Sequence, residues 1–357
     1  MASVILALTP SSVRADAVSE AVGKVSVEQY KAYEVALENM GLGLYGGPLY
    51  NQRQRNRDGW ANGGTLGNQE GRLYLTDQFS LLGLAVWTQG VYQNVVAEWP
   101  GVVTPQEIYI VCAHYDTTSG GERPGGDDNA SGTAGVLEAA RVLTQYHFRS
   151  TLRFIAFNAE EDWMLGSQEY VRALPKDANI AGVVNLDMIL RPAWDYDRKA
   201  LLDLEVETLD APRCTAWVET FVRAAATYVP SLAIDPNSHY PVRWDSGDQG
   251  PFLAAGYPAL CAVENSADEI WYQRSNAYYH SDQDASNALA NDPNSPSGVT
   301  YDYDFATNVV KAAVATLALR AVPIPPADPN AGTQPAPPAN DPAEASKGVD
   351  PGSPTRP

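Results

Sequence analysis

Acidic and imidazole side chains follow several apolar runs of the chain, at the points where those runs end. Three runs carry such residues: His114 and Asp116 after 108–113, Glu160 and Glu161 after 153–157, and Asp187 after 183–186. The carboxyl ends of parallel strands meet at one edge of a sheet, and open α/β sheets bind their ligands there. We therefore expect these side chains to form one site.

Two further segments carry residues of the same types. Asp127 and Asp128 lie in the glycine-rich turn 124–132, and His280 lies in an aromatic loop beside Tyr279. Imidazole and carboxylate groups together suit zinc. Clustered carboxylates repel one another, and a bound pair of divalent cations would remove that repulsion. The residue types therefore predict a metal centre.

The order of these segments resembles peptidase family M28, a family of co-catalytic zinc peptidases that contains secreted bacterial leucyl-type aminopeptidases. Five motifs carry the resemblance: His114-Tyr115-Asp116, Asp128-Asn129-Ala130-Ser131-Gly132, Ala159-Glu160-Glu161 followed by Leu165-Gly166-Ser167, Asn185-Leu186-Asp187-Met188, and Tyr279-His280-Ser281. The resemblance extends over residues 25–322. It implies a co-catalytic exopeptidase that acts on peptide substrates.

The resemblance also implies a set of metal ligands, position by position. Asp128 would bridge two Zn²⁺ ions, His114 and Asp187 would complete one ion, and Glu161 and His280 would complete the other. The implied cofactor is therefore two zinc ions per chain.

Three further residues receive catalytic roles from the same resemblance. Glu160 would be the general base, which takes a proton from a metal-bound water, so that a bridging hydroxide remains to attack, and returns that proton to the leaving amine. Asp116 would orient the ligand His114. Tyr279 would offer its phenol to the oxyanion of the tetrahedral intermediate. The activity implied is removal of N-terminal residues, although family members with carboxypeptidase activity leave that alternative open.

Each feature taken singly has an ordinary explanation. A Glu-Glu pair is usually a solvated face, Asp127 and Asp128 before a helix would cap it, and His280 would be a hydrogen-bonded loop residue. Their joint order favours the metal centre. For His147 we expect a surface or helix-capping position. Residues 238–248 could bring His239 toward the cleft, but we expect it not to contact substrate.

Two positions depart from the family pattern. Trp163 stands where relatives commonly have glycine, and Gln249 stands where they frequently have histidine. We expect these changes to alter substrate contacts. Cys112 and Cys261 lie in apolar runs, which predicts buried free thiols rather than the pocket disulfide of some relatives.

The apolar patterns predict a single α/β domain with a mostly parallel central sheet and helices on both faces, the zinc-dependent exopeptidase type. The expected strands include 94–97, 108–113, 153–157, 183–186 and 259–263, and helical stripes occur at 136–143, 214–221 and 310–317. Continuous apolar strands separated by amphipathic helices are typical of such sheets.

The two ends of the chain have a different character. Residues 1–24 are interpreted as an N-terminal segment, either the remnant of an export signal with an Ala15-Asp16-Ala17 cleavage pattern or a disordered start. Residues 323–357 hold 11 of the 26 prolines and are expected to form a disordered tail or linker. The domain is therefore expected over 25–322, in a secreted or extracytoplasmic protein.

Charge and hydropathy exclude other classes of function. The formal net charge is −19 with a pI near 4.5, which disfavours nucleic-acid and anionic-membrane partners. No apolar run approaches the roughly 20 residues of a membrane span, so membrane insertion is not expected. Oligomeric state is left open.

Two other functions are compatible with the same fold. A glutaminyl-cyclase-like transferase would use a single zinc, which the presence of His114 as a ligand for a second ion disfavours. A non-catalytic binding module on the same scaffold would be expected to have lost ligands, whereas the implied set is complete.

Overall fold

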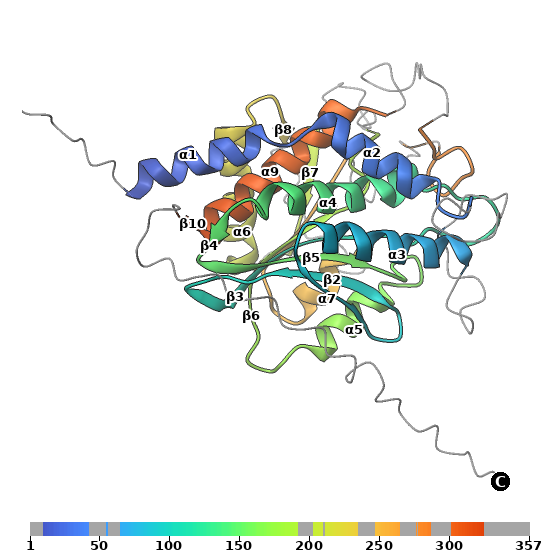
Figure 1. The fold of residues 1–357 in the computed structure, drawn as a ribbon, viewed down its shortest axis with the longest axis horizontal. Helices are drawn as coiled ribbons and strands as arrows, with labels where there is room; N and C mark the ends of the chain where they lie inside the picture. Colours follow the sequence, from blue (N-terminus) through green and yellow to red (C-terminus); the bar gives the residue numbers. More distant parts are fainter. Residues whose placement is uncertain are drawn as a thin grey trace, which may run out of the picture.

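The computed structural model of the chain describes residues 10–42, 55, 65–191, 203–209, 211–234, 247–264, 276, 278–286 and 301–324. This part of the chain begins with three helices and three strands, after which helices alternate with one or two strands at a time (Figure 1). The helical elements are α1 (Pro10–Gly23), α2 (Val27–Glu38), α3 (Leu66–Leu81), η2 (Gly126–Ser131), α4 (Gly132–Leu143), α5 (Leu165–Ala173), α6 (Pro212–Tyr228), α7 (Gln249–Ala254) and α9 (Tyr303–Ala321). The strands are β1 (Ala85–Gln89), β2 (Asn94–Trp99), β3 (Thr104–His114), β4 (His147–Phe148), β5 (Ser150–Phe157), β6 (Asn179–Leu186), β7 (Asp203–Glu207), β8 (Ala233–Ile234), β9 (Ala259–Val263) and β10 (Pro323–Ile324).

The main sheet is mixed, with a parallel centre. Its strand order is β1-β2-β5-β3-β6-β9-β7-β8. The pairs β5 with β3, β3 with β6, and β6 with β9 are parallel, whereas β1 with β2, β2 with β5, and β7 with β9 are antiparallel. The predicted parallel centre is confirmed. Antiparallel pairs flank it on both sides, and the outermost pair at one edge, β7 with β8, is parallel, features that the apolar runs did not reveal.

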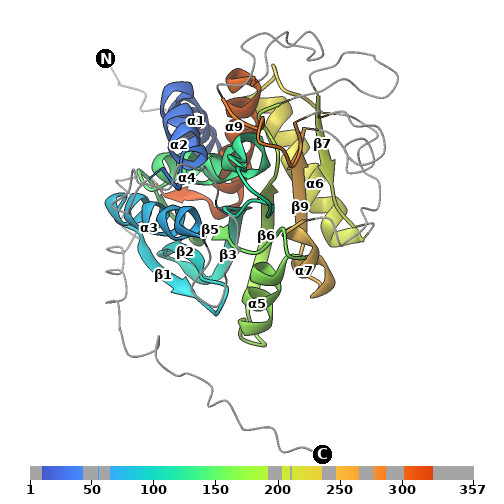
Figure 2. The same ribbon diagram turned by 90° about the vertical axis from the view of Figure 1, so that its right-hand side faces the viewer.

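Helices cover both faces of this sheet, as predicted. Side chains of β3 alternate between two cores: Val111 and Ala113 pack into the larger cluster with α4 and α9, and Ile110 and Cys112 pack into a second cluster toward α5 and α7. In Figure 2 the strands β5, β3, β6 and β9 lie side by side between the two helical layers. The carboxyl ends of the central strands are therefore held rigidly from both sides.

The folded domain extends beyond the predicted limits of 25–322. Helix α1 packs against α9, and its residues Val18, Ala21 and Val22 belong to the larger core. The Ala15–Ala17 pattern lies within this helix. At the other end, β10 pairs with β4, so Pro323 and Ile324 also belong to the fold. Residues 1–9 and 325–357, where most of the expected tail falls, lie outside the described residues.

The smaller predictions have mixed outcomes. The three cysteines are buried free thiols, as expected for Cys112 and Cys261. His147 is exposed and belongs to β4, where its ring stacks on Trp99, while Thr144 ends α4, so the capping alternative is wrong. His239 lies outside the described residues. Among the helices that the structure describes, none has the length and apolar character needed to cross a bilayer.

The packing of α1 predicts a cost for truncating Val18. This side chain is 0% exposed, so Val18→Ala removes two buried methyl groups and leaves a cavity, an effect only partly offset by the better helix propensity of alanine. We expect the free energy of unfolding to fall by about 1–2 kcal/mol, measured by chemical denaturation. The control Val91→Ala changes a 65% exposed valine and should change the free energy of unfolding by less than about 0.5 kcal/mol. Equal effects for the two variants would show that α1 does not stabilise the domain.

Candidate metal centre

The residues predicted to form a site lie together at the carboxyl ends of the central strands. His114 is the last residue of β3, Glu160 and Glu161 follow β5, and Asp187 follows β6. Asp128 lies in η2, on the connection from β3 to α4, and His280 lies in the described segment 278–286. Parallel strands thus bring three groups to one edge, and two loops add the remaining ligands.

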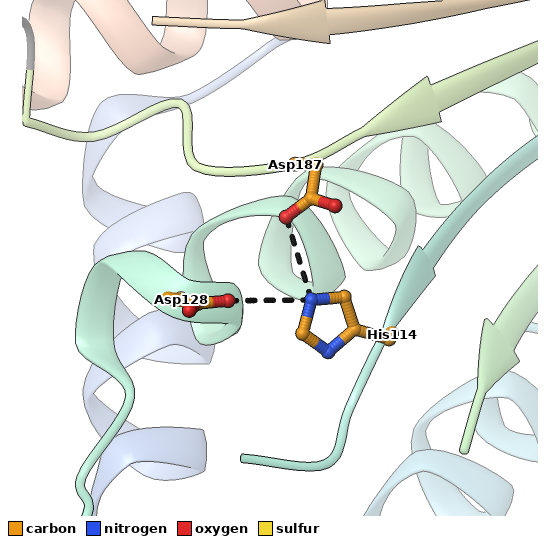
Figure 3. A group of neighbouring side chains, drawn as sticks. All are labelled: His114, Asp128 and Asp187. Carbon is orange, nitrogen blue, oxygen red and sulfur yellow. Dashed lines mark ion pairs between the residues drawn. The ribbon is translucent and has the colours of Figure 1, made fainter. Parts of the chain in front are cut away.

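His114, Asp128 and Asp187 form the first group (Figure 3). The Nε2 atom of His114 lies 3.3 Å from Oδ1 of Asp128 and 3.4 Å from Oδ1 of Asp187. All three ligand atoms lie within 4.8 Å of one another. One imidazole nitrogen and two carboxylate oxygens at this spacing can bind a divalent metal ion.

Asp128, Glu161 and His280 form a second group of the same kind. The Nε2 atom of His280 lies 3.0 Å from Oδ2 of Asp128 and 3.2 Å from Oε2 of Glu161. Asp128 therefore directs one carboxylate oxygen to each imidazole. That arrangement suits a carboxylate that bridges two ions. Within the described residues, Oε1 of Glu161 is buried without a hydrogen-bond partner, which leaves a buried lone pair for a cation.

Glu160 lies beside the first group without belonging to either. Its Oε2 is 4.0 Å from Nε2 of His114, and its side chain is 18% exposed, more than the 11% of Glu161. The neighbouring residues therefore differ in surroundings. Glu161 faces His280, and Glu160 lies near His114 with access to solvent.

Asp116 connects the loop after β3 to the loop after β5. Its carboxylate accepts hydrogen bonds from the backbone N–H groups of Glu160 (3.2 Å) and Glu161 (3.3 Å). One carboxylate oxygen also lies 3.6 Å from Nδ1 of His114, and the Asp116 backbone oxygen lies 3.2 Å from the same atom. Asp116 thus contacts the ring that it was expected to orient, and it also holds the glutamate pair.

The turn that carries Asp128 needs both its asparagine and its glycine. Asn129 donates from Nδ2 to the backbone oxygen of Leu186 (3.0 Å) and accepts from the N–H of Gly132 (2.8 Å). A Cβ atom at Gly132 would lie 2.1 Å from the Leu186 oxygen. The turn therefore packs directly on the end of β6, next to Asp187. The peptide bond between Asp128 and Asn129 is cis.

Arg55 is a buried residue of this region that the sequence did not suggest. Its guanidinium donates to the backbone oxygens of Tyr115 (2.8 Å), Leu37 (2.6 Å), Pro124 (2.6 Å) and Gly125 (2.9 Å). It thereby joins the loops that carry Asp116 and Asp128 to α2. A single arginine in a polar stretch carries no pattern from which this burial could be inferred.

The remaining predicted positions are partly as expected. The Tyr279 ring stacks on His280 with centroids 3.7 Å apart, so it lies at the site. Trp163 is 76% exposed, as a residue that meets substrate would be. Gln249, in contrast, is fully buried and accepts a hydrogen bond from Nδ2 of Asn185 (3.0 Å). The expectation that Gln249 contacts substrate is therefore not met, because the side chain is buried against Asn185 of β6.

The electrostatics of the site favour a bound cation. Burial works against charge on both histidines, but surrounding carboxylates outweigh it, so the pKa of His114 is raised and the pKa of His280 is raised to about 10. Burial and the charge of Asp128 raise the pKa of Glu161 to about 7. Burial also raises the pKa of Glu160, with Asp187 adding to that effect. The raised pKa values favour protons on the same nitrogen and oxygen atoms that a metal ion would bind, so a bound ion would replace them.

Comparisons with known proteins agree with this fold and site. The chain belongs to peptidase family M28, whose model matches residues 94–294. Aminopeptidase YwaD of Bacillus subtilis is 31% identical over 224 residues, which cover 61% of this chain and 45% of that protein. The chain spans about half the length of the curated relatives it matches.

Two solved structures share the fold at low sequence identity. The LapA aminopeptidase of Legionella pneumophila has a TM-score of 0.64 at 18% identity, over 86% of this chain and 75% of that one. A glutaminyl cyclase of Tannerella forsythia has a TM-score of 0.62 at 16% identity, over 83% of this chain and 99% of that one. The fold therefore occurs with more than one activity, and the site must distinguish them.

The raised pKa values predict that zinc binding releases protons. Zinc needs a neutral His280 and an ionised Glu161, whose pKa values in the metal-free protein are about 10 and about 7. Both groups lose protons on binding, so apparent zinc affinity should rise by at least about tenfold per pH unit between pH 6 and 8. Calorimetry in buffers of different ionisation enthalpy counts the protons. His147→Ala, at an exposed histidine, should leave the count unchanged, and a pH-independent affinity would contradict the prediction.

Proposed function

We propose that the chain is a di-zinc exopeptidase that removes N-terminal residues from peptides. The observation that carries the proposal is Asp128, whose two carboxylate oxygens lie 3.3 Å and 3.0 Å from the Nε2 atoms of His114 and His280. Asp187 and Glu161 supply the further carboxylate of each group. Membership of family M28 and the similarity to aminopeptidase YwaD support the same activity.

The five proposed ligands would hold two zinc ions, His114, Asp128 and Asp187 one of them and Asp128, Glu161 and His280 the other. When bound, the ions supply Lewis-acid polarisation of the scissile carbonyl and a water of lowered pKa. The ligands themselves must remain deprotonated, which the ions favour by replacing the protons that the buried imidazoles otherwise hold.

Glu160 performs the proton transfers in this proposal. Its carboxylate takes a proton from the attacking water, and the resulting carboxylic acid gives that proton to the nitrogen of the leaving amine as the C–N bond breaks. Burial of Glu160 raises its pKa, which favours the protonated form that the group must hold between the two steps. Tyr279, beside His280, is proposed to donate its O–H to the developing oxyanion.

Asp116 supports these steps without contacting substrate. By accepting the backbone N–H groups of Glu160 and Glu161, it fixes the two side chains relative to each other. Its contact with Nδ1 of His114 favours the tautomer that leaves Nε2 free to bind a metal.

Glu160→Gln tests the proposed base. The variant keeps the shape of the side chain and all five proposed ligands, so it should bind zinc like the wild type while hydrolysis of aminoacyl anilides falls by about 100-fold or more. Glu219→Gln, on the exposed surface of α6, is the matched control and should keep full activity. A Glu160→Gln variant with full activity would disprove the role of the base.

The same assays should include N-blocked peptides and peptides with N-terminal glutamine. Hydrolysis of N-blocked substrates from the carboxyl end would favour carboxypeptidase activity. Ammonia release without peptide cleavage would favour a cyclase.

Zinc content tests the two-ion centre separately from activity. Protein purified without chelators should hold about two zinc ions per chain, and His114→Ala and His280→Ala should each retain about one, because each removes the imidazole of one group. Mass spectrometry under native conditions or atomic absorption gives the count. His147→Ala should retain both ions. One ion in the wild type, lost only on His280→Ala, would point to a single-zinc centre.

A further inference from the structure

Asp284 joins the loop of His280 to the turn of Asp128. It is the fourth residue after His280 and is 2% exposed. Its Oδ1 accepts the backbone N–H of Asp127 (2.9 Å), and its Oδ2 accepts the backbone N–H of Asp128 (3.1 Å). Its own backbone oxygen accepts the N–H of Gly126 (2.9 Å). Three successive N–H groups of the turn are thus satisfied by one residue.

Tyr301 fixes the carboxylate from the other side. Its hydroxyl donates to Oδ1 of Asp284 over 2.6 Å, and it lies just before α9. A Cβ atom at Gly126 would lie 2.3 Å from the Tyr301 hydroxyl oxygen, so the glycine is what allows this approach. The carboxylate therefore has little freedom to move independently of the turn or of α9.

The two groups of ligands depend on this connection unequally. In the group of Asp128, Glu161 and His280, two of the three ligands lie in the segments that Asp284 joins. In the group of His114, Asp128 and Asp187, only Asp128 does. His114 and Asp187 are placed instead by the central strands β3 and β6.

Asp116 offers a precedent within the same site. It holds two successive N–H groups of the Glu160–Glu161 segment, as Asp284 holds those of Asp127 and Asp128. Asp116 was already expected to act on the site through a ligand. The same kind of contact, from Asp284 to the turn that carries Asp128, indicates a comparable role.

We propose that Asp284 is a positioning residue that sets the affinity of the ion bound by Asp128, Glu161 and His280. This inference rests on the two-ion centre of the proposed function. Asp284 holds Asp128 and His280 at the separation that one ion requires, so that ion binds without first having to order two loops. The ion bound by His114 and Asp187 depends on it less.

Asp284→Asn is the main test. Asparagine keeps the shape, but its NH₂ group cannot accept one of the two N–H groups that the carboxylate holds. Zinc titration of the apoprotein against a competing chelator measures the affinity, and the His114→Ala background isolates the ion of Asp128, Glu161 and His280. In that background we expect Asp284→Asn to weaken zinc binding by about tenfold or more. In the His280→Ala background, Asp284→Asn should lower the affinity for the remaining ion by about threefold or less. Only one ligand of that ion, Asp128, lies in a segment that Asp284 joins.

Two controls separate positioning from general destabilisation. Asp302→Asn changes the residue that caps α9 through the N–H of Phe305, and it should leave zinc affinity unchanged in both backgrounds. Tyr301→Phe removes only the hydroxyl that fixes Asp284. It should lower the affinity for the same ion as Asp284→Asn does, by a smaller factor. If Asp284→Asn does not fold, Tyr301→Phe carries the test alone.

The proposal would be overturned if a folded Asp284→Asn variant kept its zinc affinity, or if it lost affinity for both ions by the same factor. These outcomes are distinct from failure of the proposed function. A wild type that binds two zinc ions but cleaves no peptide would refute the activity and leave the role of Asp284 standing.

Discussion

One short carboxylate between two imidazoles is the constraint on which the rest of the site depends. Asp128 must present Oδ1 to His114 and Oδ2 to His280, with separations of 3.3 Å and 3.0 Å from the two Nε2 atoms. An aspartate side chain is too short to adjust for errors in backbone position. The turn of η2 therefore has to be held closely in place, and several buried polar contacts act on it.

These contacts fix the loops in the way that hydrogen bonds between strands fix the residues of a sheet. His114 and Asp187 are placed by hydrogen-bonded strands, whereas Asp128 and His280 come from loops that need separate support. Arg55 holds the carbonyls before the turn, Asp284 holds its N–H groups, and Asn129 ties it to β6. Each of these side chains is buried, and each is compensated by hydrogen bonds, as buried polar groups must be.

The sequence predicts the strand ends and the residues that the motifs carry, and it poorly predicts the contacts that hold the loops in place. The ends of β3, β5 and β6 could be located because continuous apolar runs stop at charged residues. Helix α1 was missed because Val18, Ala21 and Val22 have helical spacing but lie in a segment whose small residues also suit a cleavage signal. The roles of Arg55 and Asp284 could not be predicted, because both side chains bind backbone groups of distant segments. Every residue has such groups, so the sequence does not show which of them will be bound. Gln249 was misplaced because its neighbours in sequence do not reveal which way it faces.

The adjacent glutamates show how one fixed backbone can give two side chains different chemistry. Both N–H groups bind the same Asp116 carboxylate, so the two residues share one anchor. Successive side chains leave such an anchored segment in different directions, and Glu161 comes within 3.2 Å of His280 while Glu160 comes within 4.0 Å of His114. Glu161 is thereby drawn among the candidate ligands, and Glu160 keeps a partly exposed carboxylate beside them. The proposed division between ligand and base thus depends on a contact to the backbone, because the two side chains are chemically identical.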